Sequence, residues 1–237
     1  MLAEVLPGGS RAMGVSVWLR PPLLVLALLA SAGSEGAGSV VPDCLYAFSQ
    51  GDEQVAVEPC SGDVLGIGAN SRVISVMRYF DIAANVVAFR SCPGGRFSAR
   101  PHEADSGRFV ITYPSSANLD YLAAVVHELS HVVQIRSAGG LNALDPKANS
   151  RRIELGADFL TGLAFNGVLK HLKFGNFETS LNLIGSYKAA RSEDHGLPGH
   201  RAQAFRLGAV RAEPYKELTT AQALDYFYGN DYARLAP

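Results

Sequence analysis

Five consecutive residues, His127-Glu128-Leu129-Ser130-His131, form an HExxH motif whose side chains are suited to metal chemistry. In a helix, residues four positions apart lie one turn apart on the same face, so the two imidazoles can reach a single ion. A glutamate beside the first of two such histidines is typical of a general base that acts on water. The motif therefore predicts a zinc site with a catalytic base, Glu128.

The residues around the motif have the periodicity of a helix, which we expect over 119–136. Apolar side chains recur at the spacing of one helix face. They are Leu122, Val125, Val126, Leu129, Val132 and Val133. The histidines and Glu128 are therefore expected on the opposite face, and the helix is expected to end near Gly139-Gly140.

Two carboxylates follow in the segment 153–169, which is otherwise almost entirely apolar. Glu154 lies 23 positions after His131, and Asp158 lies four residues further on. A helix that is apolar on nearly all sides is usually buried, and a buried carboxylate needs a partner or a metal. We expect Glu154 to be the third zinc ligand and Asp158 to accept the free ring N–H of a ligating histidine. The alternative is that both carboxylates form ordinary ion pairs. The arginines available for such pairs are Arg151, Arg152 and Arg136.

At these residues the chain resembles a known family. HELSH followed by ELGAD is similar to the gluzincin-type metallopeptidases, with HExxH and then ExxAD, among them the bacterial neutral zinc metallopeptidase-like proteins. The stretch from His195 through Pro198 and Arg201 to Gly208 is similar to the HGxPxxR…F…G pattern of that family. The resemblance covers roughly residues 108–208. It implies a zincin-like domain that hydrolyses peptide bonds in a peptide or protein substrate.

By this resemblance His127, His131 and Glu154 are zinc ligands and Glu128 is the base. A metzincin is excluded, because Gln134 and Ser137 occupy the places of its glycine and third histidine. Four other histidines could replace Glu154 as a ligand, and they are His102, His171, His195 and His200. All of them except His195 are expected at the surface.

His195 stands in a Gly-Pro turn of the kind that often lines a cleft. It is a candidate donor to the oxyanion of the reaction, and the alternative is an ordinary loop histidine; Arg191 and Tyr187 are further candidates for that role.

Composition limits the remaining possibilities. With 237 residues, of which 48% are hydrophobic, the chain is long enough for one well-buried domain. The formal net charge of −1 provides no electrostatic footprint for nucleic acid.

The N-terminus predicts export. Arg11 and Arg20 precede the apolar run 23–30, and small residues follow it, which together read as a signal peptide over 1–32, with Met13 as an alternative start. The run is short for a membrane span, so we expect a membrane association only if this segment is not cleaved. The location expected is secreted or periplasmic.

Three cysteines precede the motif, and an oxidising compartment favours one disulfide among them. Cys44 with Cys60 and Cys60 with Cys92 are both permissible pairs.

The whole pattern predicts an α+β fold that is mainly helical. A linker over 33–42 leads into one domain over 43–237, with a β-rich part over 43–107 and the zinc-binding helical part over 108–237. Short strands or mixed elements are expected at 45–48, 55–57, 72–80 and 85–89, and the clearest strand at 108–113. We expect that last strand to form the edge of the cleft, where an extended peptide can add as a further strand. Further helices are expected over 151–170, 178–191, 198–212 and 219–228.

These observations predict an exported zinc metallopeptidase. The alternative is a zinc-bearing, catalytically idle binding or assembly module of the cell envelope, although a site that only holds metal gains nothing from Glu128.

Overall fold

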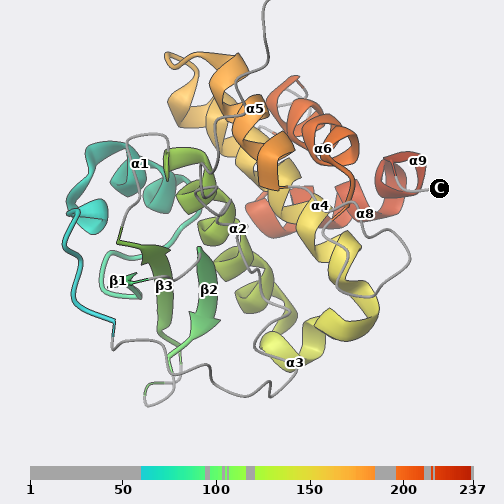
Figure 1. Cartoon of the computed structure of the whole chain (residues 1–237). Coiled ribbons are helices and arrows are strands. Elements are labelled where there is room, and N and C mark those ends of the chain that lie inside the picture. The colour runs from blue at the N-terminus through green and yellow to red at the C-terminus, as the bar shows by residue number, and fades with distance from the viewer. Residues whose placement is uncertain are drawn as a thin grey trace, which may run out of the picture. The chain divides into compact units, whose positions relative to one another are not determined.

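The computed structural model describes residues 60–93, 97–102, 105, 107–115, 121–184, 196–210, 215 and 217–235, all within the unit Val40–Pro237. The predicted signal peptide, the linker and the strands at 45–48 and 55–57 lie outside these residues. The described part is mainly helical with a small sheet, so the α+β class is confirmed (Figure 1). None of its helices is both long enough and apolar enough to cross a bilayer.

The elements begin with η2 (Ile67–Ala69), α1 (Ser71–Tyr79), β1 (Val87–Cys92), β2 (Ser98–Pro101) and β3 (Phe109–Pro114). Next come α2 (Leu122–Ala138), α3 (Leu141–Leu144), α4 (Pro146–Ala164) and the π-helical turn η4 (Phe165–Leu169). The last are α5 (Phe174–Ile184), α6 (Pro198–Val210), α8 (Thr220–Asn230) and α9 (Tyr232–Leu235). The predicted helices overlap α2, α4, α5, α6 and α8.

The sheet has the order β1-β3-β2, with β1 parallel to β3 and β2 antiparallel to it. Strand β3 is the strand predicted at 108–113, but it is central and fully buried. The prediction that it forms the cleft edge is therefore wrong, because both of its sides are already hydrogen-bonded. Among the described strands, β2 is the edge on that side of the sheet.

The segment 72–80, expected as a strand or mixed element, is mostly helix α1. Asn70 caps it by accepting a hydrogen bond from the backbone N–H of Arg72. Val73, Val76 and Met77 are buried at helical spacing. The β-branched residues of this segment therefore pack as one face of a helix rather than as a strand.

Helix α2 is buried on all sides rather than on one face. Every side chain from Leu122 to Ile135 is buried except that of Ala124. The helix contacts α1, β2 and β3 as well as α4, α5 and α8, and lies between the sheet and α4 in Figure 1. It ends as predicted, with Gly139 at positive φ, a conformation that glycine adopts without steric cost. The polar side chains of the motif consequently need partners inside the protein.

Helices α4 and α6 approach each other backbone to backbone. A Cβ atom on Gly162 would lie 2.1 Å from the carbonyl oxygen of Phe205, and one on Gly208 would lie 2.0 Å from that of Phe159. Only glycine permits such a crossing. The contact matters for the site, because these two helices carry charged residues that surround the motif.

A disulfide joins Cys60 to Cys92 at the end of β1. Of the two permissible pairs, the structure therefore contains the one between these cysteines. Disulfides of this kind persist in oxidising compartments.

Candidate metal centre

The two histidines of the motif and Glu154 of α4 converge on one point. The Nε2 atoms of His127 and His131 lie 3.1 Å apart, and the rings meet edge to face. One oxygen of Glu154 lies 3.1 Å from His127 Nε2, and the other lies 3.5 Å from His131 Nε2. The structure thus brings together the three side chains that the sequence predicts as ligands.

These spacings fit a tetrahedral metal site. Atoms bonded to zinc at about 2.0–2.1 Å with tetrahedral angles lie roughly 3.3 Å from one another. The separations of 3.1, 3.1 and 3.5 Å are close to that value, with one oxygen of Glu154 facing each histidine. Ligand atoms of His127, Glu128 and His131 also lie within 4.8 Å of one another, so this buried group could hold a metal ion. Both Glu128 and Glu154 therefore have a carboxylate near the two histidines, and Glu154 oxygens lie at 3.1 and 3.5 Å from the Nε2 atoms.

Asp158 fixes the orientation of His127. One oxygen of its carboxylate lies 2.9 Å from His127 Nδ1. A carboxylate only accepts hydrogen bonds, so Nδ1 carries a proton and Nε2 faces His131 and Glu154. This contact is the one expected of a carboxylate that orients a metal-binding histidine.

A buried arginine, Arg201 of α6, completes the cluster. Its Nε and Nη2 atoms donate to the two oxygens of Asp158 at 2.7 and 2.9 Å. The same Nη2 lies 3.6 Å from Glu154 and 3.2 Å from His127 Nε2. Asp158 and Glu154 therefore both have an ion-pair partner, as in the alternative considered from sequence. That partner is Arg201, which is not one of the three arginines expected there. The sequence contained Arg201 in the HGxPxxR stretch, yet nothing in that pattern indicated its partner.

Glu128 is buried beside this cluster. Burial raises the pKa of its carboxyl to about 8; the charge of Glu154 adds to this, while His127 and Arg201 oppose it. The backbone N–H of Ala99 on β2 is close enough to lower this pKa slightly. It does not make a well-formed hydrogen bond, and both oxygens of Glu128 lack a hydrogen-bond partner among the described residues. A buried carboxyl with a strongly raised pKa and no such partner is a candidate functional group.

The two histidines differ in proton affinity. Burial and Arg201 lower the pKa of His127, but Asp158 and Glu154 raise it more, and the result is about 9. Burial lowers the pKa of His131 to about 4, although the charge of Glu154 opposes this. In the metal-free protein near neutral pH, His127 is thus a cation and His131 is neutral.

The residues expected to stabilise an oxyanion lie outside the described part of the chain. They are Tyr187, Arg191 and His195. Of the other histidines, His171 is exposed as predicted, whereas His102 and His200 are partly buried rather than exposed.

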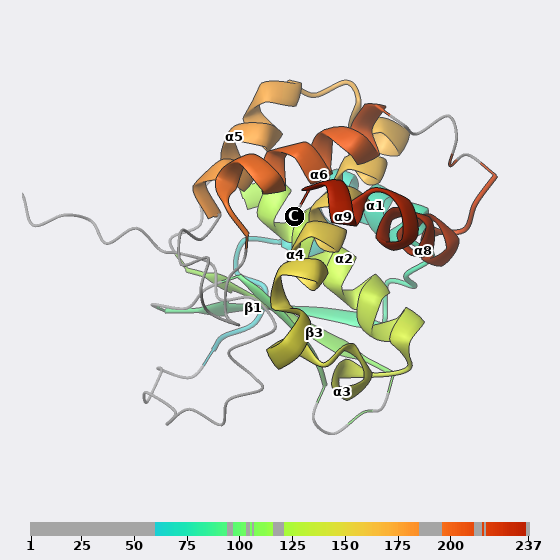
Figure 2. The ribbon, with the colours of Figure 1, turned by 90° about the vertical axis from the view of Figure 1, so that its right-hand side faces the viewer.

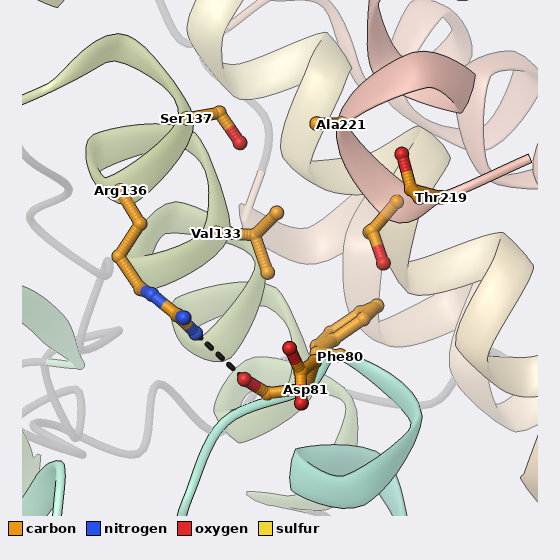
Figure 3. A pocket seen from close by; sticks show the side chains of 8 residues that line it. Phe80, Asp81, Val133, Arg136, Ser137, Thr219 and Ala221 are labelled. Carbon is orange, nitrogen blue, oxygen red and sulfur yellow. Dashed lines mark hydrogen bonds between the residues drawn. The ribbon is translucent and has the colours of Figure 1, made fainter.

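An open hollow of about 280 Å³ lies where α1, α2 and α8 meet, and its lining includes Phe80, Val133 and Thr219 (Figure 3). Arg136 also lines it, and donates to the backbone oxygen of Asp81 at 2.8 Å. The hollow contains none of the motif residues. Arg136 therefore makes its hydrogen bond away from the candidate metal site.

In comparisons with known proteins, no family model, curated protein or solved structure matched the chain.

Proposed function

We propose that the protein is a zinc-dependent hydrolase that cleaves peptide bonds, with His127, His131 and Glu154 as the metal ligands. The observation that carries this proposal is the convergence of His127 Nε2, His131 Nε2 and the two carboxylate oxygens of Glu154, at separations of 3.1–3.5 Å. Beside them lies the buried carboxyl of Glu128, which has no hydrogen-bond partner among the described residues. Two imidazoles and one carboxylate form a donor set that leaves a fourth position open in catalytic zinc sites. The zincin-like assignment of the fold belongs to the same proposal and is supported by the motif on α2.

Zinc bound at these residues would supply Lewis acidity toward water and toward a carbonyl oxygen. Glu128 is the general base in this proposal. Its carboxylate takes a proton from the attacking water and later returns it to the leaving nitrogen. A divalent cation nearby favours the ionised carboxylate, which opposes the effect of burial on its pKa. Asp158, held by Arg201, keeps His127 in the orientation that the ligand role needs.

The free side of β2 is where we expect the substrate to bind. Its pairing with β3 leaves the outer side without a partner among the described strands, and the N–H of Ala99 points toward Glu128. An extended peptide that adds to this edge has its backbone beside the base. This proposal moves the docking edge from β3, as expected from sequence, to β2. The disulfide between Cys60 and Cys92 supports export as part of the proposal.

The decisive experiment combines metal analysis with hydrolysis of a mixed peptide library, with and without a chelator. Glu128→Gln should retain zinc and lose about 10²–10⁴-fold in rate, because only the proton acceptor is removed. Glu217→Gln, on an exposed turn, is the matched control and should leave both unchanged. Glu154→Ala should weaken zinc retention. Zinc loss in Glu128→Gln together with full retention in Glu154→Ala would reverse the ligand assignment.

A specific observation favours a second function, a metal-holding module without turnover. The side chains of His127, Glu128 and His131 are completely buried, and Glu154 is only 3% exposed. A substrate must therefore displace covering residues before it reaches Glu128. Tight zinc binding with no chelator-sensitive hydrolysis of any library peptide would favour this second function over the first.

A further inference from the structure

The second histidine of the motif, His131, has a hydrogen-bond partner on α2, and that partner is in turn bonded to a residue of α8. Gln134, on the same helix as His131, places its Oε1 at 2.7 Å from His131 Nδ1. The Nε2 of Gln134 donates to the backbone oxygen of Ile153 at 2.8 Å and to the hydroxyl of Tyr228 at 2.9 Å. All these contacts are buried or partly buried. They connect the candidate metal site to helix α8, which packs against α4 (Figure 2).

The backbone carbonyl of Ile153 determines which atoms donate and which accept in the hydrogen bonds of Gln134 and His131. A carbonyl only accepts, so the NH₂ group of Gln134 must face it, and the amide oxygen must face His131. That oxygen can only accept as well, so His131 Nδ1 carries the proton. The lone pair of His131 then lies on Nε2, the atom that points to His127 and Glu154.

Space for this arrangement comes from a glycine. A Cβ atom on Gly156 of α4 would lie 2.2 Å from the hydroxyl oxygen of Tyr228 and 2.7 Å from Nε2 of Gln134. The Tyr228 hydroxyl and the Gln134 amide therefore occupy the space that a side chain at position 156 would fill. The guanidinium of Arg152 lies over the ring of Tyr228, 4.3 Å from the ring centre. Tyr228 is thus contacted at its hydroxyl by Gln134 and over its ring by Arg152.

We propose that Gln134 and Tyr228 are positioning residues that hold His131 in the tautomer whose Nε2 lone pair faces the metal position. This inference rests on the proposed metal site. It makes α8 part of that site, although α8 contributes no ligand. Tyr228 acts through Gln134, and Gln134 acts through His131.

The test uses the full chain and compares Gln134→Leu and Tyr228→Phe with wild type. The ¹⁵N chemical shifts of the imidazoles report the tautomer of His131, first in metal-free protein and then with zinc. Wild type should have His131 protonated at Nδ1. In Gln134→Leu the Nδ1 atom has lost its acceptor, so the tautomer protonated at Nε2 should increase, with Glu154 as the new acceptor. The signals of His127, whose Nδ1 faces Asp158, serve as an internal reference.

Zinc affinity, measured by competition with a chelator, is the second readout. Loss of such an orienting partner costs about 10–100-fold in metal affinity. We expect Gln134→Leu to fall in this range and Tyr228→Phe to change the affinity less, in the same direction. Tyr226→Phe makes the same substitution at an exposed position of α8 and should match wild type. Gln203→Leu, at an exposed position of α6, is the control for Gln134→Leu.

The outcomes separate this inference from the proposed function. If folded Gln134→Leu keeps both the wild-type tautomer and the wild-type zinc affinity, the positioning role is overturned while the metal site stands. If wild type binds no zinc, the proposed function fails. The tautomer measurement in metal-free protein then still decides whether Gln134 controls the proton of His131.

Discussion

Replacement of Gly208 by alanine tests whether the close crossing of α4 and α6 holds the metal cluster together. The new methyl carbon would lie 2.0 Å from the carbonyl oxygen of Phe159 and 2.9 Å from the amide nitrogen of Leu163. Ordinary contacts of a Cβ atom begin near 3.4 Å, so the two helices must separate by more than an ångström. Both obstructing atoms belong to the backbone of α4, so no side-chain rotation can relieve the clash.

The expected cost follows from two opposing effects. Overpacking in a well-packed interior destabilises by about 1–3 kcal/mol, and by more where the backbone has to move. Alanine recovers up to about 1 kcal/mol through its higher helix propensity. We therefore expect a net loss of about 2 kcal/mol, equivalent to a melting temperature lower by roughly 4–8 °C for a chain of this size. Since α6 carries Arg201 and α4 carries Asp158, zinc affinity should fall too.

Urea unfolding followed by circular dichroism measures the loss of stability, and competition with a chelator measures the loss of zinc affinity. Gly199→Ala is the matched control, because it lies on the same helix with nothing within 4 Å of the added carbon. It should leave stability unchanged or slightly higher. The reasoning is refuted if Gly208→Ala unfolds at the same urea concentration as Gly199→Ala and binds zinc equally well.

Three further predictions concern the charged cluster and the disulfide. Arg201→Met should destabilise by about 3–5 kcal/mol in urea unfolding, because it leaves the buried carboxylate of Asp158 unpaired, and adding Asp158→Asn should recover part of that loss. In metal-free protein, His127 with a pKa of about 9 and Glu128 with a pKa of about 8 keep protons that their unfolded forms, at 6.5 and 4.5, have already released; the melting temperature should therefore fall as pH rises from 6.5 to 9, and a rise over this window would contradict the assignment. Zinc should reduce this fall, because it replaces the proton of His127. Replacement of Cys60 and Cys92 by serine opens a link across a sequence separation of 32, and should cost about 3–4 kcal/mol of unfolding free energy without changing zinc stoichiometry.

Short-range patterns made several parts of the structure predictable. The spacing of His127 and His131 requires only one helical turn, and the glycine at 139 marks the end of α2 because it adopts a left-handed conformation without steric cost. The strong apolar character around Glu154 and Asp158 indicated a buried helix that brings its carboxylates to the motif. Each of these inferences depends on the spacing of residues within one helix, and that spacing can be seen in the order of residue types along the chain.

Longer-range features depended on how the elements pack. The sequence pattern identified the strand at 108–113, but only its pairing on both sides showed that β3 is central and that β2 is the edge. The face of α2 that carries His127 and His131 is covered, and α4 and α6 provide the charged partners of His127.

The partners of the motif are the clearest example of what tertiary structure decided. Arg201 meets Asp158 across 43 positions of sequence, and Tyr228 meets Gln134 across 94. Local sequence determined that two imidazoles share one helix face. Which side chains surround them depends on the close crossing of α4 with α6 and on the packing of α8, because a hydrogen-bond partner is selected by distance in space and not by position along the chain.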